Sequence, residues 1–478
     1  MTEVPMNPRD NFFSGLAFAA GMLLSISVEC IIPNNFSDPI PVHQVSGPGV
    51  SFIQTKKLKK GMQGIEFNIS PYRHRIKNAY DKFGKQTRLG NMLGKWNWLG
   101  ILYGTEIPVS GVGTSTAYNE TTKAHYVHLT TQPRLYAARD NLGTMTSTAR
   151  PDPALETSGF YDVDYQLERL GVRGSVCVDV MDGIQLSVRG GICDYRITPS
   201  YNDPFDITKN TDFTSSSDPT VGHHADILTY MMKPDYREDI AKELGINMES
   251  YRKVVAEDVT ALLSARQTMF LKSKTGDEVV KFCPRVTGGI IMPTGQLKDQ
   301  DIIHSMSTGN SDVMGGVVEA AIDLDFVNTV EFSVCGGYTF FSTSTASRTV
   351  RVPNDRAQSG IYPWKCPVKI KRGDTWHLNV AMKARDFIKG AHFFCDYSWI
   401  VHRRDEITLN GTATENEFFT IAPAKMAEES EWRNDMFHVG LLFDVTPDLN
   451  IGIGAQVSRG GIHSYRTHTM IGTVGFTF

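Results

Sequence analysis

The chain has 478 residues, of which 41% are hydrophobic and 21% are charged, and its formal net charge is -4. This near-neutral composition does not predict nucleic acid as a partner. With a mean hydropathy of -0.22 and no internal apolar run near the roughly 20 residues that a transmembrane helix needs, the mature chain is not expected to be a helical membrane protein.

The N-terminal segment has the size of a secretory signal. An apolar stretch, FFSGLAFAAGMLLSISV, follows Arg9 and is succeeded by sequence rich in proline, asparagine and serine. Residues 1–30 are therefore predicted to be a cleaved export signal, with a buried helix or first strand as the alternative. Residues 31–58 are predicted to be a periplasmic segment, and 59–478 the main domain.

The rest of the chain is organised in pairs of alternating segments joined by short turns. Four such pairs are VRGSVCVDV-MDG-IQLSVRGGICDY, VVEAAIDLDF-VNT-VEFSVCGGYTFF, WHLNVAMKAR-DFIK-GAHFFCDYSWIV and FHVGLLFDV-TPD-LNIGIGAQVS. Each predicts a β-hairpin. Long polar stretches separate the hairpins at 197–256, 293–314, 343–373 and 404–434. Short turns at one end and long loops at the other are typical of outer-membrane barrels.

The predicted fold is all-β: a transmembrane antiparallel up-and-down barrel of about 14 strands with long extracellular loops. The predicted strands are 61–72, 95–104, 122–132, 170–180, 184–196, 257–271, 279–292, 315–325, 330–342, 374–385, 390–403, 435–446, 449–459 and 467–478. A short helix near 236–253 is expected within loop 197–256. This loop is the predicted constriction of the barrel mouth, with a surface cap outside the barrel as the alternative.

Aromatic residues gather at the long-loop ends of the strands, which predicts a girdle at a membrane interface. The residues concerned are Trp96, Trp98, Trp376, Trp399, Trp432 and Tyr338.

Ionisable residues occupy the strand faces opposite the apolar ones, which predicts that they line a lumen, because a basic residue facing lipid at the midplane costs about 2–4 kcal/mol. The predicted basic lining residues are Arg173, Arg189, Arg266, Arg285 and Lys383. The predicted acidic ones are Asp179, Glu319, Asp323, Asp325, Glu331, Asp396 and Asp444. Basic and acidic residues fall on adjoining arcs of wall, so they could form a charged eyelet across water. A lumen filled by mutually paired charges is the alternative.

Residues 257–295, EDVTALLSARQTMFL…KFCPRVTGGIIMPTG, resemble the strand–turn–strand–Pro-Thr-Gly pattern of bacterial outer-membrane channel proteins, including barrels linked to uptake of aromatic compounds. The final strand ends in GFTF, and its alternating aromatics with terminal Phe478 resemble the signal read by the barrel-assembly machinery. By this resemblance Phe476 and Phe478 are assembly-signal residues.

The sequence therefore predicts an outer-membrane channel for passive diffusion of small polar solutes or ions. The alternatives are a specific channel for hydrophobic or aromatic compounds and a barrel-anchored adhesion protein. The expected partners are outer-membrane lipid and the assembly machinery, with a homo-oligomer possible. Seven cysteines without a recurrent spacing predict neither a zinc site nor a disulfide framework. No phosphate-loop or hydrolase motif occurs, so no enzymatic activity, metal or cofactor is expected.

Overall fold

The computed structural model describes residues 64–97, 160–202, 236–243, 245–272, 278–296, 298–309, 313–326, 329–342, 348–353, 362, 364–388, 390–409 and 423–478. The predicted export signal and periplasmic segment, and the predicted strand 122–132, lie outside these residues.

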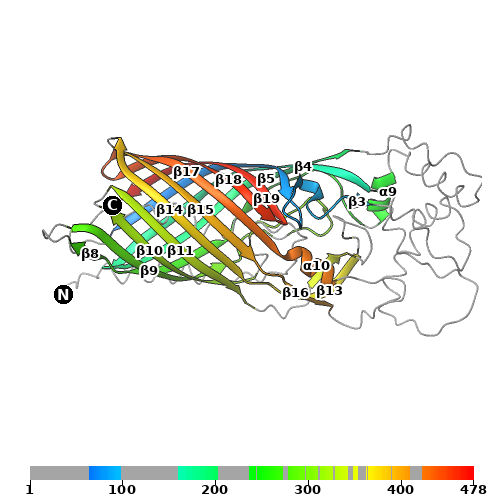
Figure 1. Ribbon diagram of the computed structural model, residues 1–478. Helices are drawn as coiled ribbons and strands as arrows, with labels where there is room; N and C mark the ends of the chain where they lie inside the picture. The colour runs from blue at the N-terminus through cyan, green and yellow to red at the C-terminus, as the bar shows by residue number, and fades with distance from the viewer. Residues whose placement is uncertain are drawn as a thin grey trace, which may run out of the picture. The chain divides into compact units, whose positions relative to one another are not determined.

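The described chain forms a closed antiparallel barrel (Figure 1). In chain order its wall consists of β1 (Ile65–Tyr80), β4 (Phe160–Met181), β5 (Ile184–Asn202), the interrupted strand β6 (Tyr251–Ala256), β7 (Val259–Arg266) and β8 (Met269–Lys272), β9 (Glu278–Met292), β10 (Gly315–Phe326), β11 (Val330–Phe341), β14 (Thr375–Ile388), β15 (Ala391–His402), β17 (Trp432–Thr446), β18 (Leu449–Ile462) and β19 (Ser464–Thr477). Each strand pairs with its neighbour, and β1 pairs with both β4 and β19, which closes a wall of 12 strands.

The predicted fold class is confirmed, and 12 of the predicted strands are the 12 wall strands. Because β1 pairs directly with β4, no wall strand lies between them in the described part of the chain, and the described part of the predicted strand 95–104 stands outside the 12-strand wall. Instead, the β1–β4 connection contains β2 (Gln86–Arg88), the 3₁₀ turn η1 (Leu89–Asn91) and β3 (Trp96–Asn97). The helix expected in loop 197–256 is present but shorter, as α9 (Tyr236–Glu243). The predicted helix included residues 251–253, but residues 251–256 form the strand β6, which pairs with β5.

Two long loops build a second, smaller sheet. It contains β12 (Arg348–Val352), β13 (Trp364–Lys371) and β16 (Glu406–Leu409), and its buried cluster includes residues of α10 (Pro423–Ser430). Val350, Val368 and Ile370 are buried there together with Met426. These three strands bring the number of strands close to the predicted total, although they stand outside the wall.

Alternation of burial along the strands separates two faces. On β10, for example, Val318 and Ile322 are exposed on the outside, whereas Glu319 and Ala321 are buried toward the inside. The same pattern on neighbouring strands produces an outer surface of exposed Val, Ile, Leu and Phe. A soluble monomer rarely exposes so large an apolar area, so this band is the lipid-facing surface of the barrel.

Among the described residues, no helix is long and apolar enough to cross a membrane.

The C-terminus completes the wall. Phe478 donates its backbone N–H to the Ile65 carbonyl oxygen at 2.9 Å, and Ile65 donates to the Phe478 carbonyl at 3.3 Å. Both ends of the described barrel therefore lie at the end with the short turns. Because β19 is paired on both sides, no free strand edge remains at the terminus.

Candidate functional site

The inward face of the barrel wall carries the predicted ionisable residues. The structure places on this face Arg173, Arg189, Arg266, Arg285, Lys383, Asp179, Glu319, Asp323, Asp325, Glu331, Asp396 and Asp444. Most are buried or half-buried, and Asp444 is the exception because it lies next to a turn. These side chains are therefore distributed around the lumen side of the wall.

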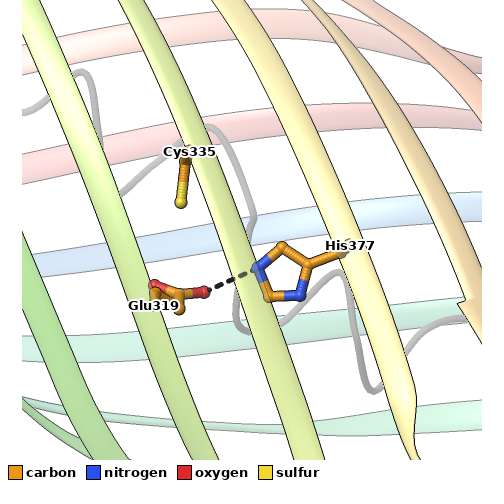
Figure 2. Close-up of side chains that lie close together, drawn as sticks. All are labelled: Glu319, Cys335 and His377. Carbon is orange, nitrogen blue, oxygen red and sulfur yellow. Dashed lines mark hydrogen bonds and ion pairs between the residues drawn. The ribbon is translucent and has the colours of Figure 1, made fainter.

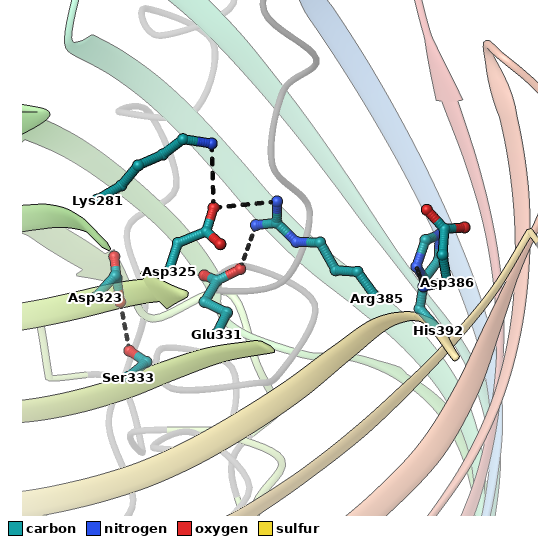
Figure 3. A network of polar contacts seen from close by, with 8 residues as sticks. All are labelled: Lys281, Asp323, Asp325, Glu331, Ser333, Arg385, Asp386 and His392. Atoms are coloured by element: carbon teal, nitrogen blue, oxygen red, sulfur yellow. Dashed lines mark hydrogen bonds and ion pairs between the residues drawn. The ribbon is translucent and has the colours of Figure 1, made fainter. Parts of the chain in front are cut away.

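A four-membered charge network occupies the short-turn end of the lumen (Figure 3). The Asp325 carboxylate accepts from Lys281 Nζ at 3.4 Å and from Arg385 Nη1 at 3.3 Å. Arg385 Nη2 donates to Glu331 Oε2 at 2.5 Å. Lys281 and Arg385 were absent from the predicted lining set, although each lies an even number of residues from a member of it. The period-two pattern would have found both.

A second ionic cluster joins the wall to the strand interruption. Glu257 lies between β6 and β7, and its carboxylate accepts from Arg173 Nε at 2.7 Å and Nη2 at 2.9 Å. Tyr72 donates its hydroxyl to the same carboxylate at 2.6 Å, and the Arg173 guanidinium lies over the Tyr72 ring. Charges are thus paired locally, which differs from two separate walls of opposite sign.

Inward histidines form further pairs with carboxylates. His377 Nε2 lies 3.1 Å from Glu319 Oε1, and His438 Nδ1 lies 2.9 Å from Asp396 Oδ2. These pairs bridge strands, because His377 reaches across β11 from β14 to β10. They extend the polar lining around the barrel away from the arginine-rich strands.

The loop after β9 is anchored to the interruption between β6 and β7. Thr294, within the Pro-Thr-Gly sequence, donates its hydroxyl to the Glu257 carbonyl at 2.8 Å and accepts from the Val259 N–H at 3.0 Å. The Gly295 N–H donates to Asp258 Oδ1 at 2.8 Å. At Gly309 a Cβ atom would lie 2.3 Å from the same carboxylate oxygen, so a side chain there would displace Asp258.

Between these anchors, loop 298–309 packs into an aromatic cluster at the long-loop end of the wall. His304 Nδ1 lies 2.8 Å from the Tyr165 hydroxyl, and the imidazole stacks on the Trp96 ring. Met306 Sδ accepts from the hydroxyl of Tyr195, a residue of β5. Burial lowers the pKa of His304 to about 3, so the ring is neutral at physiological pH.

The constriction by loop 197–256 stays a prediction, because residues 203–235 lie outside the described structure. The described part of loop 197–256 contributes Ala241 and Ile246 to the buried cluster that also contains Ile303 and Met306 of loop 298–309. Both loops therefore help to build this end of the barrel. Narrowing of the lumen by either loop remains a proposal.

The structure places only some of the predicted girdle residues on the outer face. Trp376 and Trp399 are 44% and 38% exposed on the outer face, and the Tyr338 ring lies 4.5 Å from that of Trp376. The prediction is wrong for Trp96 and Trp432, which are 1% and 4% exposed. Trp96 donates its indole N–H to the Gly90 carbonyl and Trp432 stacks on His402, so both side chains are packed against protein. Trp98 lies outside the described residues.

The terminal phenylalanines lie on the outer face. Phe476 and Phe478 are both exposed, and the Phe478 ring makes an edge contact with Phe67 of β1. This placement puts apolar rings at the short-turn end of the lipid-facing band.

A closed, even-stranded antiparallel barrel with an apolar exterior, exposed interfacial aromatics and a polar interior defines a transmembrane barrel of the bacterial outer-membrane class.

Searches for relatives find similarity only at the level of structure: no protein-family model and no curated protein matches the chain. An outer-membrane channel from Pseudomonas putida F1 is similar at 8% identity and a TM-score of 0.44, covering 89% of this chain and 100% of that one. The Ralstonia pickettii toluene transporter matches at 8% identity and a TM-score of 0.30, covering 87% and 90%. The translocator domain of the autotransporter NalP from Neisseria meningitidis matches at 11% identity and a TM-score of 0.29, covering 76% of this chain and 100% of that one. No conclusion about function follows from similarity this low.

Proposed function

We propose that this protein is a non-enzymatic outer-membrane channel through which small polar solutes or ions diffuse. The observation that supports the proposal best is the presence of ionisable side chains of both signs on the inward face of a closed barrel. Such a lining can replace part of the hydration of a polar solute, and paired charges can exchange one partner for the solute.

The proposed path has two different parts. At the short-turn end, a solute meets the network of Lys281, Asp325, Glu331 and Arg385. At the other end, it meets loop 298–309, which is anchored through hydrogen bonds such as that from Gly295 to Asp258. Selectivity is proposed to come from the charge network and access from the loop.

Single-channel recording in planar bilayers tests this function. The folded full-length protein is expected to conduct, and a complete lack of conductance would reject the channel and favour a barrel that only anchors its extracellular loops. The double variant Asp325→Asn/Glu331→Gln removes both negative charges of this network and keeps Lys281 and Arg385. We expect its reversal potential in a salt gradient to shift toward anion preference.

A matched control uses the same end of the barrel. Asp182 lies in the β4–β5 turn and is exposed, so Asp182→Asn removes one negative charge without altering the described lining. Its reversal potential should remain that of the unmodified protein. An equal shift in the control and the double variant would show that the charge network does not determine selectivity.

A second candidate function is passage of hydrophobic or aromatic compounds, which the aromatic cluster around His304 and Trp96 favours. Apolar solutes partition into such surroundings better than sugars or ions do. Liposomes containing the protein would then take up a labelled aromatic compound faster than empty liposomes. Equal uptake by both kinds of liposome would reject this candidate function without contradicting the proposed channel for polar solutes.

We also propose that Phe476 and Phe478 form the assembly signal. Replacing Phe478 with serine should reduce the amount of folded barrel in the outer membrane, while the same protein refolded in detergent should form the barrel normally. Unchanged membrane levels would contradict this role.

A further inference from the structure

Three potential metal ligands from neighbouring strands meet in the barrel interior. Glu319 lies on β10, Cys335 on β11 and His377 on β14, and all three side chains are buried. Their nearest carboxylate oxygen, thiol sulfur and ring nitrogen lie within 4.8 Å of one another. Figure 2 shows the three side chains pointing toward a common point.

The distances require little movement to accommodate an ion. In a tetrahedral zinc site, bond lengths of about 2.0–2.3 Å place neighbouring ligand atoms about 3.4–3.6 Å apart. His377 Nε2 and Glu319 Oε1 are already 3.1 Å apart. The Cys335 sulfur lies within 4.8 Å of the other two atoms, so it would have to approach them by up to about 1 Å to complete three corners of a tetrahedron.

The backbone makes room for this convergence at one glycine. The His377 side chain crosses over Gly337, where a Cβ atom would lie 2.2 Å from His377 Cε1 and 3.0 Å from Glu319 Cγ. Any side chain at this position would separate the histidine from the glutamate. By contrast, a Cβ at the preceding Gly336 would meet nothing within 4 Å.

The hydrogen bonding of the histidine is also incomplete. His377 is 4% exposed and its Nδ1 has no hydrogen-bond partner in the part of the chain that the structure describes. Cys335 is a free thiol. Burying these polar groups inside the barrel has a desolvation cost that a bound cation would offset.

We propose that Glu319, Cys335 and His377 bind a single divalent transition-metal ion of the zinc type, leaving a fourth coordination position for water or a solute. Thiolate and imidazole are ligands that zinc prefers, whereas calcium and magnesium prefer oxygen. Arg285 on β9 adds positive charge close to Cys335, so the bonds from all three ligands must outweigh its repulsion of the ion. Binding would release the thiol proton. The proposal does not depend on conduction through the barrel.

Cobalt(II) titration of the refolded full-length protein tests the site, because thiolate ligation produces a charge-transfer absorption that carboxylate and imidazole alone do not. We expect one Co²⁺ per chain with this absorption, displaced by Zn²⁺ but not by Mg²⁺. Cys335→Ala should abolish the absorption, and His377→Gln should weaken binding at least about 10-fold. Cys283→Ser and His438→Gln provide controls, since both residues also face inward but lie outside the cluster.

Gly337→Ala tests the geometry while retaining all three ligands. It should weaken Co²⁺ binding as much as loss of a ligand does, whereas Gly336→Ala should bind normally. Circular dichroism must show folded barrel in each variant that is compared. The proposal is overturned by absence of stoichiometric Co²⁺ binding at micromolar concentrations. It is equally overturned if folded Cys335→Ala and His377→Gln bind as well as the unmodified protein.

Discussion

Replacing Glu257 with alanine is expected to destabilise the barrel strongly. Its carboxylate is 2% exposed and accepts two hydrogen bonds from Arg173 and one from Tyr72. Removing it leaves a guanidinium in the wall without its counter-ion, which typically costs about 3–5 kcal/mol. Because the Arg173 side chain keeps 24% of its surface exposed, water can solvate part of the charge. We therefore expect a loss near the lower limit, about 3 kcal/mol.

Equilibrium urea unfolding of the protein in lipid vesicles measures this loss. Asp194→Ala is the matched control, because Asp194 also accepts a bidentate pair of hydrogen bonds, from Arg252, but at the surface. Exposed ion pairs contribute little to stability, so this variant should unfold almost like the unmodified protein. The contrast between the two variants isolates the effect of burial.

A double variant separates loss of the pair from loss of packing. Arg173→Met/Glu257→Leu leaves no unpaired charge and should recover much of the stability lost in Glu257→Ala. If Glu257→Ala lost no more stability than Asp194→Ala, the inferred contribution of the buried pair would be refuted.

Three further predictions concern loop 298–309 and the tryptophans. Gly309→Ala should displace Asp258 and release the loop, increasing single-channel conductance; unchanged conductance would argue against the loop as a restriction. Burial depresses the pKa of His304 to about 3, below its unfolded value near 6.5, so its contribution to stability is complete above about pH 6.5 and decreases toward pH 3. In urea unfolding, His304→Phe should reduce the change in the free energy of unfolding between pH 6.5 and pH 3. An unaltered pH dependence would contradict the depressed pKa of His304. Brominated lipids should quench fluorescence more in a variant retaining only Trp376 than in one retaining only Trp96, since only the former faces lipid.

Strand alternation alone was sufficient for much of the candidate site. It placed Glu319, Asp325 and Lys383 on the inward face, because successive side chains of a strand point to opposite sides. It could not predict their partners. The Arg385 pairs with Asp325 and Glu331 depend on the register of β14, β11 and β10, which follows from closure of the barrel.

The position of a tryptophan near the end of a strand did not predict whether its side chain faces lipid. Trp96 and Trp376 both lie near the long-loop end, yet one is buried and the other faces outward. Their difference arises because Trp96 belongs to the β1–β4 connection, which packs against His304, whereas Trp376 stands on the outer face of β14. The sequence does not reveal which connections turn inward.

By itself, the sequence determined the all-β class and the face of each wall strand that meets lipid, and its 14 predicted strands included all 12 that form the wall. These features follow from a local period of two and from turn chemistry. Only the tertiary structure decided that β1 closes directly on β4, that loop 298–309 packs at the long-loop end, and that Glu319, Cys335 and His377 converge. Those contacts join residues far apart in the chain, which come close together only when the barrel closes.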